Sequence, residues 1–373
     1  MKTAFVYSDE FAGFDYGSGH PLKPFRLKLT YELIKACRLL APSDPRLVEP
    51  HLASLEDLLR YHTREYIDIL RKANSGEYVT GAESFGLGPG DNPIFPGMFD
   101  WSRLIAGASL KAADLVDSGE AVIAFNIAGG LHHARASQAS GFCYINDPVL
   151  AIKSLVEQGR RVAYIDIDAH HGDGVQEAFF GTDKVLTISL HETGHVLFPG
   201  SGFEHEIGEG AGKGYSVNIP LPPETDDELF IYAFAETVPE LVAGFKPDVV
   251  VSQLGVDTFQ SDPLAHLNLT TNGFCLAVRM IKSLAPKWVA LGGGGYDIAN
   301  VARAWTLAWA IMNDTDAPDD IPEAFLRQYP GFGFQSRNLR DKPFVIEGRK
   351  MEEMKAEVDG VIGYIKENVM KRI

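Results

Sequence analysis

Short apolar runs rich in β-forming residues alternate with longer segments of helical periodicity along nearly the whole chain. We expect strands over Thr3–Tyr7, Ala121–Asn126, Val162–Asp168, Val185–Leu190, Tyr215–Ile219, Val249–Leu254 and Trp288–Leu291. Several of these runs are apolar without alternation, as is typical of parallel strands covered on both faces. Strands that alternate with helices predict βαβ units and a parallel sheet.

Apolar residues recur at helical spacing between these runs. The expected helices are Pro24–Leu40, Met98–Val116, Asn146–Gln158, Asp226–Phe245, Asn272–Ser283, Ile298–Met312 and a last one within Met351–Ile373. Ser75–Pro96 is rich in Gly, Pro and Asn and predicts a long ordered surface loop, a kind that is uncommon without a function. The polar, proline-containing stretch Asp314–Arg349 predicts irregular structure. Since no repeat or Ser/Gly linker divides the chain, we expect one domain over residues 1–373.

The charge balance excludes some classes of partner. With 34 basic and 50 acidic residues the net charge is -16, which argues against nucleic-acid binding, because phosphate contacts need a basic face. No apolar run approaches the roughly 20 residues that cross a bilayer. The three cysteines have no CxxC spacing and read as thiols of a reducing compartment. The N-terminal apolar run is too short for a signal peptide, so we expect a soluble cytoplasmic protein.

Ionisable and aromatic residues follow the expected strands where each one ends. Asp166, Asp168 and His170 close one strand, and the other such residues are His132, His133, His191, Phe198, Asp257 and Tyr296. The carboxyl ends of parallel strands share one edge of a sheet, and ligands of open α/β sheets bind outside that edge. The sequence therefore predicts that residues more than 160 positions apart form one site.

Asp168, His170 and Asp257 have the chemistry of a metal site. Asp168 and His170 lie two positions apart on an extended segment, so their side chains point the same way. Asp257 would add a third ligand and leave a position for water, which is the pattern of a catalytic zinc site. Because this set is rich in oxygen, iron(II) can compete with zinc. A buried ion pair or a helix cap is the structural alternative.

His132 and His133 form a separate pair. Adjacent histidines are often a surface accident, but Asp166 and Asp173 could orient these two. A carboxylate on one ring nitrogen fixes the tautomer and raises the basicity of the other nitrogen. Such a dyad can take a proton from water and then give one to a leaving amine.

Tyr296 follows four glycines, Gly292 to Gly295. The glycines allow a tight turn that brings the phenol close to the metal, where its hydroxyl could donate to a developing oxyanion. A core tyrosine is the structural alternative. Phe142 and Phe198 follow the same rim and could wall a narrow apolar slot, although each alone is more typical of a core residue than of a pocket.

Together these stretches resemble the metal-dependent histone deacetylases of the arginase-deacetylase superfamily. Within that family the chain is most similar to the class I enzymes and the bacterial acetoin-utilisation deacetylases. The matching stretches are HPLKPFR from His20, AGGLHHA from Ala128, GFCYIND from Gly141, YIDIDAHHGDGVQEAF from Tyr164, SLH from Ser189, GKGYSVNIPLP from Gly212, QLGVD from Gln253 and LGGGGYDIANVARAW from Leu291. They occur in the family's order over about three hundred residues.

The resemblance implies a single α/β domain on an open eight-stranded parallel sheet with helices on both faces. It implies hydrolysis of N-acetyl-lysine in proteins to lysine and acetate. The zinc ligands by position are Asp168, His170 and Asp257. The catalytic residues by position are His132, His133 (the general base), Asp166, Asp173 and Tyr296 (which polarises the acetyl carbonyl).

The resemblance further implies a substrate tunnel, an internal cavity and two sites for K⁺ or Na⁺. Gly141, Phe142, Phe198 and Leu264 would line the lysine tunnel, and Asp91 would hold the substrate backbone at its mouth. Arg26 would lie by a cavity behind the metal, where acetate can leave. One cation site would use Asp166, Asp168, His170, Ser189 and Leu190, and the other would use the backbone oxygens of Phe179, Thr182, Val185 and Tyr215.

Three other functions were weighed. A two-metal ureohydrolase would carry aspartates where this chain has Gly172 and Gly255, so one metal is favoured. An amidohydrolase for acetylpolyamines or other small amides fits the acidic balance, but no inserted loop that would narrow the entrance is evident. A non-catalytic acetyl-lysine-binding module would lack a ligand, a dyad member or the tyrosine, and all are present.

The rim loops depart most from the family pattern, so the protein substrate need not be a histone. The sequence predicts no particular oligomeric state.

Overall fold

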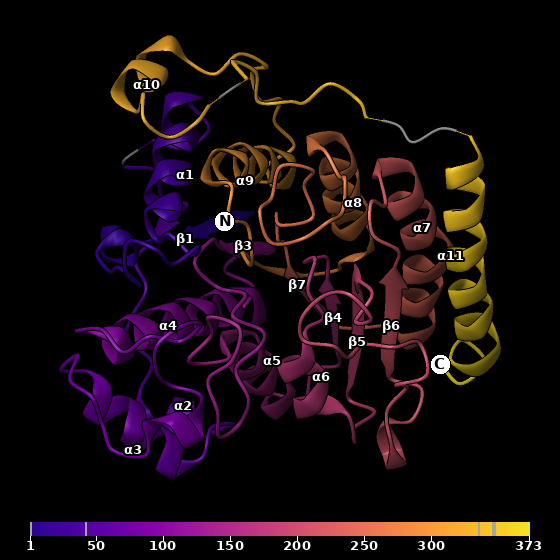
Figure 1. Ribbon diagram of the computed structural model, residues 1–373, viewed down its shortest axis with the longest axis horizontal. Coiled ribbons are helices and arrows are strands. Elements are labelled where there is room, and N and C mark those ends of the chain that lie inside the picture. Colours follow the sequence, from indigo (N-terminus) through magenta and orange to yellow (C-terminus); the bar gives the residue numbers. More distant parts are fainter. Residues whose placement is uncertain (1, 42, 335, 345–347) are drawn as a thin grey trace.

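Eight parallel strands form one sheet in a computed structural model that describes residues 2–41, 43–334, 336–344 and 348–373 (Figure 1). The strand order is β2-β1-β3-β8-β7-β4-β5-β6. The bounds are β1 Thr3–Val6, β2 Leu47–Val48, β3 Ile123–Asn126, β4 Val162–Asp166, β5 Val185–Glu192, β6 Ser216–Leu221, β7 Val249–Gln253 and β8 Trp288–Leu291. Every residue of these strands outside β2 is buried, which explains the absence of apolar alternation in their sequences.

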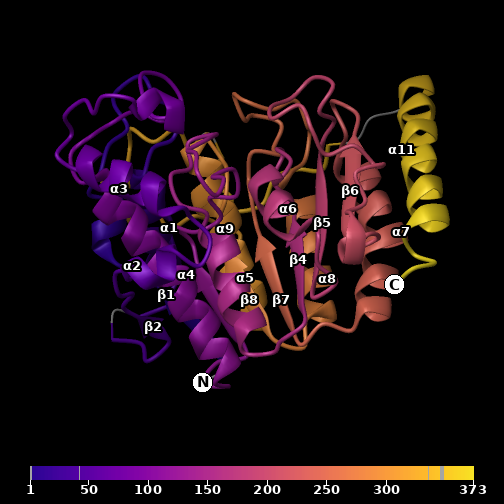
Figure 2. The ribbon, with the colours of Figure 1, turned by 90° about the horizontal axis from the view of Figure 1, so that it is seen from below.

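Helices cover both faces of the sheet (Figures 1 and 2). One layer contains α1 (Phe25–Ala36), α9 (Ile298–Met312), α8 (Thr271–Leu284) and α7 (Asp227–Phe245). The opposite layer contains α4 (Met98–Asp117), α5 (Asp147–Glu157) and α6 (Asp173–Phe179). The remaining helices are α2 (Leu55–Leu58), α3 (Arg64–Ala73), α10 (Glu323–Gln328) beside α1, and α11 (Arg349–Asn368), which packs on α7 and β6. The predicted α/β fold with a parallel sheet is confirmed.

Several elements differ from the prediction. The strand β2 and the helices α2, α3, α6 and α10 were not predicted, because segments of two to ten residues hold too little periodicity. The irregular stretch expected over Asp314–Arg349 contains α10, and the loop expected over Ser75–Pro96 contains a 3₁₀ turn at Ala82–Phe85. β5 extends to Glu192, so His191 lies inside the strand, whereas β4 ends at Asp166 and leaves Asp168 in the following turn.

The register of the sheet brings four strand ends together. Leu291 at the end of β8 pairs with Asn126 of β3 and with Gln253 of β7. Asp166 of β4 pairs with Gln253 and with Ser189 of β5. The turns that leave β3, β8, β7 and β4 therefore start from neighbouring points along one edge. Among the described residues, none of the helices is both long and apolar enough to span a membrane.

Candidate active site

Asp168, His170 and Asp257 meet above the ends of β4 and β7. The Nδ1 atom of His170 lies 3.2 Å from Asp168 Oδ1 and 3.0 Å from Asp257 Oδ2, and the ligand atoms of the three residues lie within 4.8 Å of one another. All three side chains are buried. The predicted convergence of these three residues is thus present in the fold.

The other oxygen of each carboxylate is held by a hydrogen bond. Asp168 Oδ2 accepts from the side-chain amide of Gln253 (2.6 Å) and from the backbone N–H of Gly294 (2.8 Å). Asp257 Oδ1 accepts from the backbone N–H of Ala169 (2.9 Å). Bonds of this kind fix the orientation of metal-ligating carboxylates. They leave Asp168 Oδ1 and Asp257 Oδ2 directed at His170.

The electrostatics of this cluster favour a positive charge at its centre. Burial and the charge of Asp168 raise the pKa of Asp257 to about 6. Burial opposes protonation of His170, but hydrogen bonds with Asp168 and Asp257 outweigh it and raise the pKa of His170 to about 10. Two buried carboxylates and one imidazole at this spacing fit a divalent cation, which would replace a proton on the imidazole.

Gly172 and Gly255 stand close to these carboxylates. A Cβ at position 255 would lie 2.2 Å from Asp168 Oδ2, and one at position 172 would lie 2.6 Å from Asp166 Oδ2. The backbone thus leaves no room for side chains at the two positions where the ureohydrolase alternative needs aspartates. This geometry favours one divalent ion over two.

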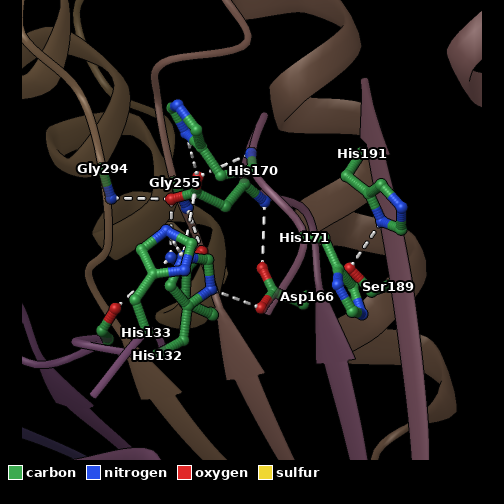
Figure 3. Close-up of polar contacts among 12 residues, drawn as sticks. His132, His133, Asp166, His170, His171, Ser189, His191, Gly255 and Gly294 are labelled. Atoms are coloured by element: carbon green, nitrogen blue, oxygen red, sulfur yellow. Dashed lines mark hydrogen bonds and ion pairs between the residues drawn. The ribbon is translucent and has the colours of Figure 1, made fainter. Parts of the chain in front are cut away.

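His132 and His133 lie side by side, below His170 in the view of Figure 3. Their Nε2 atoms are 2.9 Å apart. Each Nδ1 faces a carboxylate at 2.8 Å, His132 that of Asp166 and His133 that of Asp173. All four side chains are buried. The two aspartates therefore lie where the sequence placed them, one behind each histidine.

The two rings differ in protonation. Burial opposes the charged form of His132, but Asp166 and Asp168 outweigh it and raise the pKa of His132 to about 9. Burial and the charge on His132 lower the pKa of His133 to about 4. With each Nδ1–H directed at a carboxylate, one further proton lies between the Nε2 atoms, on His132. The dyad thus holds one mobile proton at neutral pH.

Tyr296 follows the turn of four glycines and lines one small cavity together with His132 and His133. A Cβ at Gly294 would lie 2.1 Å from Asp257 Oδ2, so only glycine lets this turn approach the carboxylates. Burial and the charges of Asp257 and Asp168 raise the pKa of Tyr296 above its ordinary value, which keeps the phenol protonated. Its hydroxyl makes no hydrogen bond to any described residue, so it is free to donate to a ligand.

The comparisons with known proteins agree with this geometry. A family model for the histone deacetylase domain matches residues 20–312. The chain belongs to the histone deacetylase family. It is 41% identical over 337 residues to histone deacetylase 1 of Homo sapiens, covering 90% of this chain and 69% of that protein. It is 43% identical over 332 residues to the acetoin utilization protein AcuC of Bacillus subtilis, covering 87% of this chain and 85% of that protein.

Solved structures of deacetylase homologues share the fold. A crystal structure of a histone deacetylase homologue complexed with SAHA has a TM-score of 0.90 at 36% identity, covering 98% of this chain and all of that chain. A homologue from Aquifex aeolicus has a TM-score of 0.89, also at 36% identity and with the same coverage. The predicted arginase-deacetylase fold is therefore confirmed, and the protein is a hydrolase of the metal-dependent deacetylase family.

The aromatic residues expected to line the deacetylase tunnel stand beside Tyr296 and His133. The ring of Phe142 lies 5.7 Å from that of Tyr296, and the ring of Phe198 lies 5.0 Å from that of His133. Phe142 has a φ of 68°, which is rare for a non-glycine residue and is typical of functional positions. Gly141 packs between the two walls, where a Cβ would meet His133 and Phe198 at under 3 Å.

Arg26 and two rim residues lie at different depths of this deacetylase site. Arg26 is buried behind the cluster and donates to the carbonyls of Gly293 and Gly295, both at 2.7 Å. It lines a small inner cavity of about 20 Å³ together with Phe142 and Tyr296. Asp91 and Leu264 do not reach that cavity. They line an outer hollow of about 480 Å³, which Phe142 separates from the inner one.

The residues predicted to bind K⁺ or Na⁺ lie on β4, β5 and the segments that flank α6 and β6. Ser189 Oγ is 2.8 Å from His191 Nδ1 (Figure 3). The carbonyls of Phe179 and Tyr215 accept hydrogen bonds from the amides of Thr182 and Thr187. The Tyr215 carbonyl also accepts from the hydroxyl of Thr187 at 3.5 Å. The two cation sites stay predictions, with Leu190 and Val185 on β5 as their other backbone contributors.

Three residues that support the site were missed at the sequence level. Asp147 accepts from the amides of Gly130 and Leu131 and so fixes the turn before the dyad. Gln253 holds Asp168, and Asp262 accepts from the amide of Tyr296. Asp147 and Gln253 occur within the GFCYIND and QLGVD stretches, which offered a signal that was not used.

Proposed function

We propose that this protein hydrolyses N-acetyl-lysine in proteins or peptides to lysine and acetate. The observation that carries the proposal is the buried histidine dyad with its two aspartates, set beside the Asp168–His170–Asp257 cluster and opposite the free phenol of Tyr296. A non-catalytic binding module would have no use for a mobile proton between two buried rings.

Asp168, His170 and Asp257 would hold the catalytic ion, with zinc as the first choice and iron(II) as the second. When bound, such an ion lowers the pKa of a coordinated water and polarises the acetyl carbonyl. The predicted structural K⁺ or Na⁺ ions would lie behind this cluster and keep Asp166 and Asp168 in place.

The chain's own residues would move the protons. His133 Nε2, once its hydrogen bond with His132 Nε2 opens, takes a proton from the attacking water as the oxygen adds to the acetyl carbon. Tyr296 donates its hydroxyl hydrogen bond to the carbonyl oxygen as that oxygen becomes negative. The dyad then delivers a proton to the lysine nitrogen as the C–N bond breaks. One proton is taken and one is given, so the dyad returns to its starting state with lysine and acetate as products.

The rim favours a polypeptide over a small amide. The outer hollow beside Leu264 is matched by a second one of about 510 Å³ that runs along Glu83, Gly86 and Gln138, and the two share Gly90 and Asp91. The Asp91 carboxylate makes no hydrogen bond to the described residues and could accept one from a substrate backbone. Open space on both sides of Asp91 suits a chain that continues past the acetyl-lysine. An acetylpolyamine or other small amide would leave both hollows unused.

The first test is acetate release from acetyl-lysine peptides by the wild type and by Tyr296→Phe, each loaded with one equivalent of zinc. Loss of one preorganised donor to an oxyanion typically costs about 10²–10³ in kcat. We therefore expect a fall of that size with zinc stoichiometry unchanged. Acetylspermidine is assayed in parallel.

Turnover of acetylspermidine at a far higher kcat/KM than that of any peptide would replace the proposed substrate by a polyamine. A wild type that binds zinc and releases no acetate from either would refute the deacetylase assignment. Two transition-metal ions per chain would overturn the one-metal site.

A further inference from the structure

The turn that carries Tyr296 has little rigidity of its own. It consists of Gly292 to Gly295, and Gly295 has a φ of 134°, a region open to glycine alone. A run of glycines has the largest backbone freedom of any sequence. The position of the phenol must therefore be imposed from outside the turn.

A buried carboxylate supplies one such anchor. Asp262 Oδ2 accepts the backbone N–H of Tyr296 at 2.8 Å, and Asp262 is 7% exposed. Its other oxygen, Oδ1, accepts the backbone N–H of Leu264 at 3.0 Å. One carboxylate thus joins the backbone of the catalytic tyrosine to that of a residue in the outer hollow.

A second pair of bonds joins the same two segments. Ser261 Oγ donates to Asp297 Oδ2 at 2.7 Å, and Asn300 Nδ2 donates to Ser261 Oγ at 2.6 Å. Asp262 itself is fixed by its backbone N–H, which donates to the carbonyl of Phe259 at 2.8 Å. The segments 259–264 and 296–300 are therefore cross-linked at several points, and the Tyr296 amide is the point nearest the chemistry.

We propose that Asp262 is a positioning residue that sets the phenol of Tyr296 relative to the wall at Leu264. The proposal rests on the deacetylase function proposed above. Asp262 touches no reacting atom. It acts through Tyr296, so its removal lowers kcat more than it raises KM, because the phenol contributes most when the carbonyl oxygen becomes negative.

The test is a double-mutant cycle with Asp262→Asn and Tyr296→Phe. Asparagine keeps the shape of the side chain but offers only one acceptor oxygen to the two amides. We expect Asp262→Asn to lower kcat by about 10- to 100-fold, as for other groups that orient a catalytic side chain. In the Tyr296→Phe background the same change should lower kcat by less than about threefold, since the hydroxyl it positions is already gone.

Glu192→Gln is the matched control. Glu192 is buried, and its carboxylate contacts His266, two residues beyond Leu264. One carboxylate oxygen accepts the backbone N–H of His266 at 2.8 Å, and the other lies 2.9 Å from its Nδ1. Glu192 therefore supports the chain just after Leu264 and makes no bond to Tyr296. Glu192→Gln should change kcat by the same factor in the wild type and in Tyr296→Phe. An Asp262→Asn effect that is also the same in both backgrounds would overturn the proposal.

Hydrogen exchange without substrate provides the second measurement. Amides 292–297 should lose protection in Asp262→Asn and keep it in Glu192→Gln. Unchanged protection in Asp262→Asn would overturn the anchoring role. If exchange behaves as expected while no acetyl-lysine peptide is turned over, the anchoring role stands and the proposed substrate fails.

Discussion

His132 and His133 are neighbours in the chain and share a hydrogen bond, yet their pKa values move in opposite directions, to about 9 and about 4. Both rings are buried, so burial cannot distinguish them. The difference comes from their surroundings: Asp166 and Asp168 both act on His132, whereas His133 has the charged His132 beside it. At the scale of residues, the carboxylates decide which ring holds the mobile proton.

Replacing Asp166 by asparagine should shift the alkaline limb of the pH profile of kcat/KM. The carboxylate favours the charged form of His132, so its removal lowers the pKa of His132 from about 9. If protonated His132 feeds the leaving amine, activity will then be lost at a lower pH. We expect the alkaline limb of kcat/KM to shift down by about 1 unit or more, measured between about pH 6 and 10.

Tyr164→Phe is the control for this change, because the Tyr164 hydroxyl donates to the same Asp166 oxygen at 2.7 Å and its loss leaves the charge in place. An alkaline limb that moves equally in both variants would contradict the role of the Asp166 charge.

Residue-level prediction succeeded where chemistry and strand ends coincide. Asp168, His170, Asp257 and Tyr296 each follow a strand, so a parallel sheet brings them together whatever the loops do. Asp262 lies nine residues after the end of β7, in a loop whose path no periodicity describes. Its contact with the Tyr296 amide is a result of tertiary packing.

Between elements, His62 joins the start of α3 to the start of α5. Its Nδ1–H donates to the carbonyl of Arg135 at 3.0 Å, and its Nε2 accepts the backbone N–H of Asn146 at 3.1 Å. The bond from Asn146 requires the neutral ring, because protonation of Nε2 would remove the lone pair that accepts it. Asn146 in turn caps α5 and donates its side-chain amide to the carbonyls of His132 and Ala134. The contact between these helix starts therefore supports the turn of the dyad.

This contact should make stability depend on pH. Burial lowers the pKa of His62 to about 4, below its ordinary value of 6.5. Between these values the unfolded state binds more protons, so the contribution of His62 is complete above pH 6.5 and is lost as the pH falls toward 4. The loss is about 3 kcal/mol at most. Urea unfolding at pH 7, 5.5 and 4.5 would measure it.

His62→Gln keeps a donor and an acceptor but cannot be protonated. The variant should therefore lose less free energy of unfolding over this pH range than the wild type. Equal losses would assign the acid sensitivity to other buried groups, such as His171 and His191, whose pKa values burial also lowers.

Element prediction was reliable for long elements and failed for short ones. The predicted helix Ile298–Met312 has the bounds of α9, because an N-cap at Asp297 and sustained periodicity define it. The two-residue strand β2 exists only because β1 offers it a pairing edge. The seven residues of α6 follow directly on the turn that carries His170 and His171, and they are too few for a helical period to show in the sequence.

At the scale of the whole molecule, the sheet has one long edge strand, β6, whose outer side must be shielded from pairing with another chain. β6 ends the sheet, and α11 packs against it and against α7 (Figure 2). The buried face of α11 consists of Met354, Val358, Ile362 and Ile365. The family model ends at residue 312, before α11 begins. An uncovered edge strand is a template for pairing with another chain.

Val358→Asp should detach this helix. A charge at a position with no exposed surface and no partner costs on the order of 3 to 5 kcal/mol, so we expect a lower Tm together with self-association. The net charge of -16 makes the molecules repel one another, so association should be weak at low salt and increase as salt screens the repulsion. Light scattering across a salt series would measure it.

Lys366→Gln is the control on the same helix. It removes only a half-exposed pair with Glu236 on α7, which is worth no more than about 1 kcal/mol, and it leaves the apolar face intact. It should stay unassociated at every salt concentration. If Val358→Asp also stays unassociated and keeps its Tm, then α11 is not what protects β6, and the rest of the sheet edge must be closed to pairing without it.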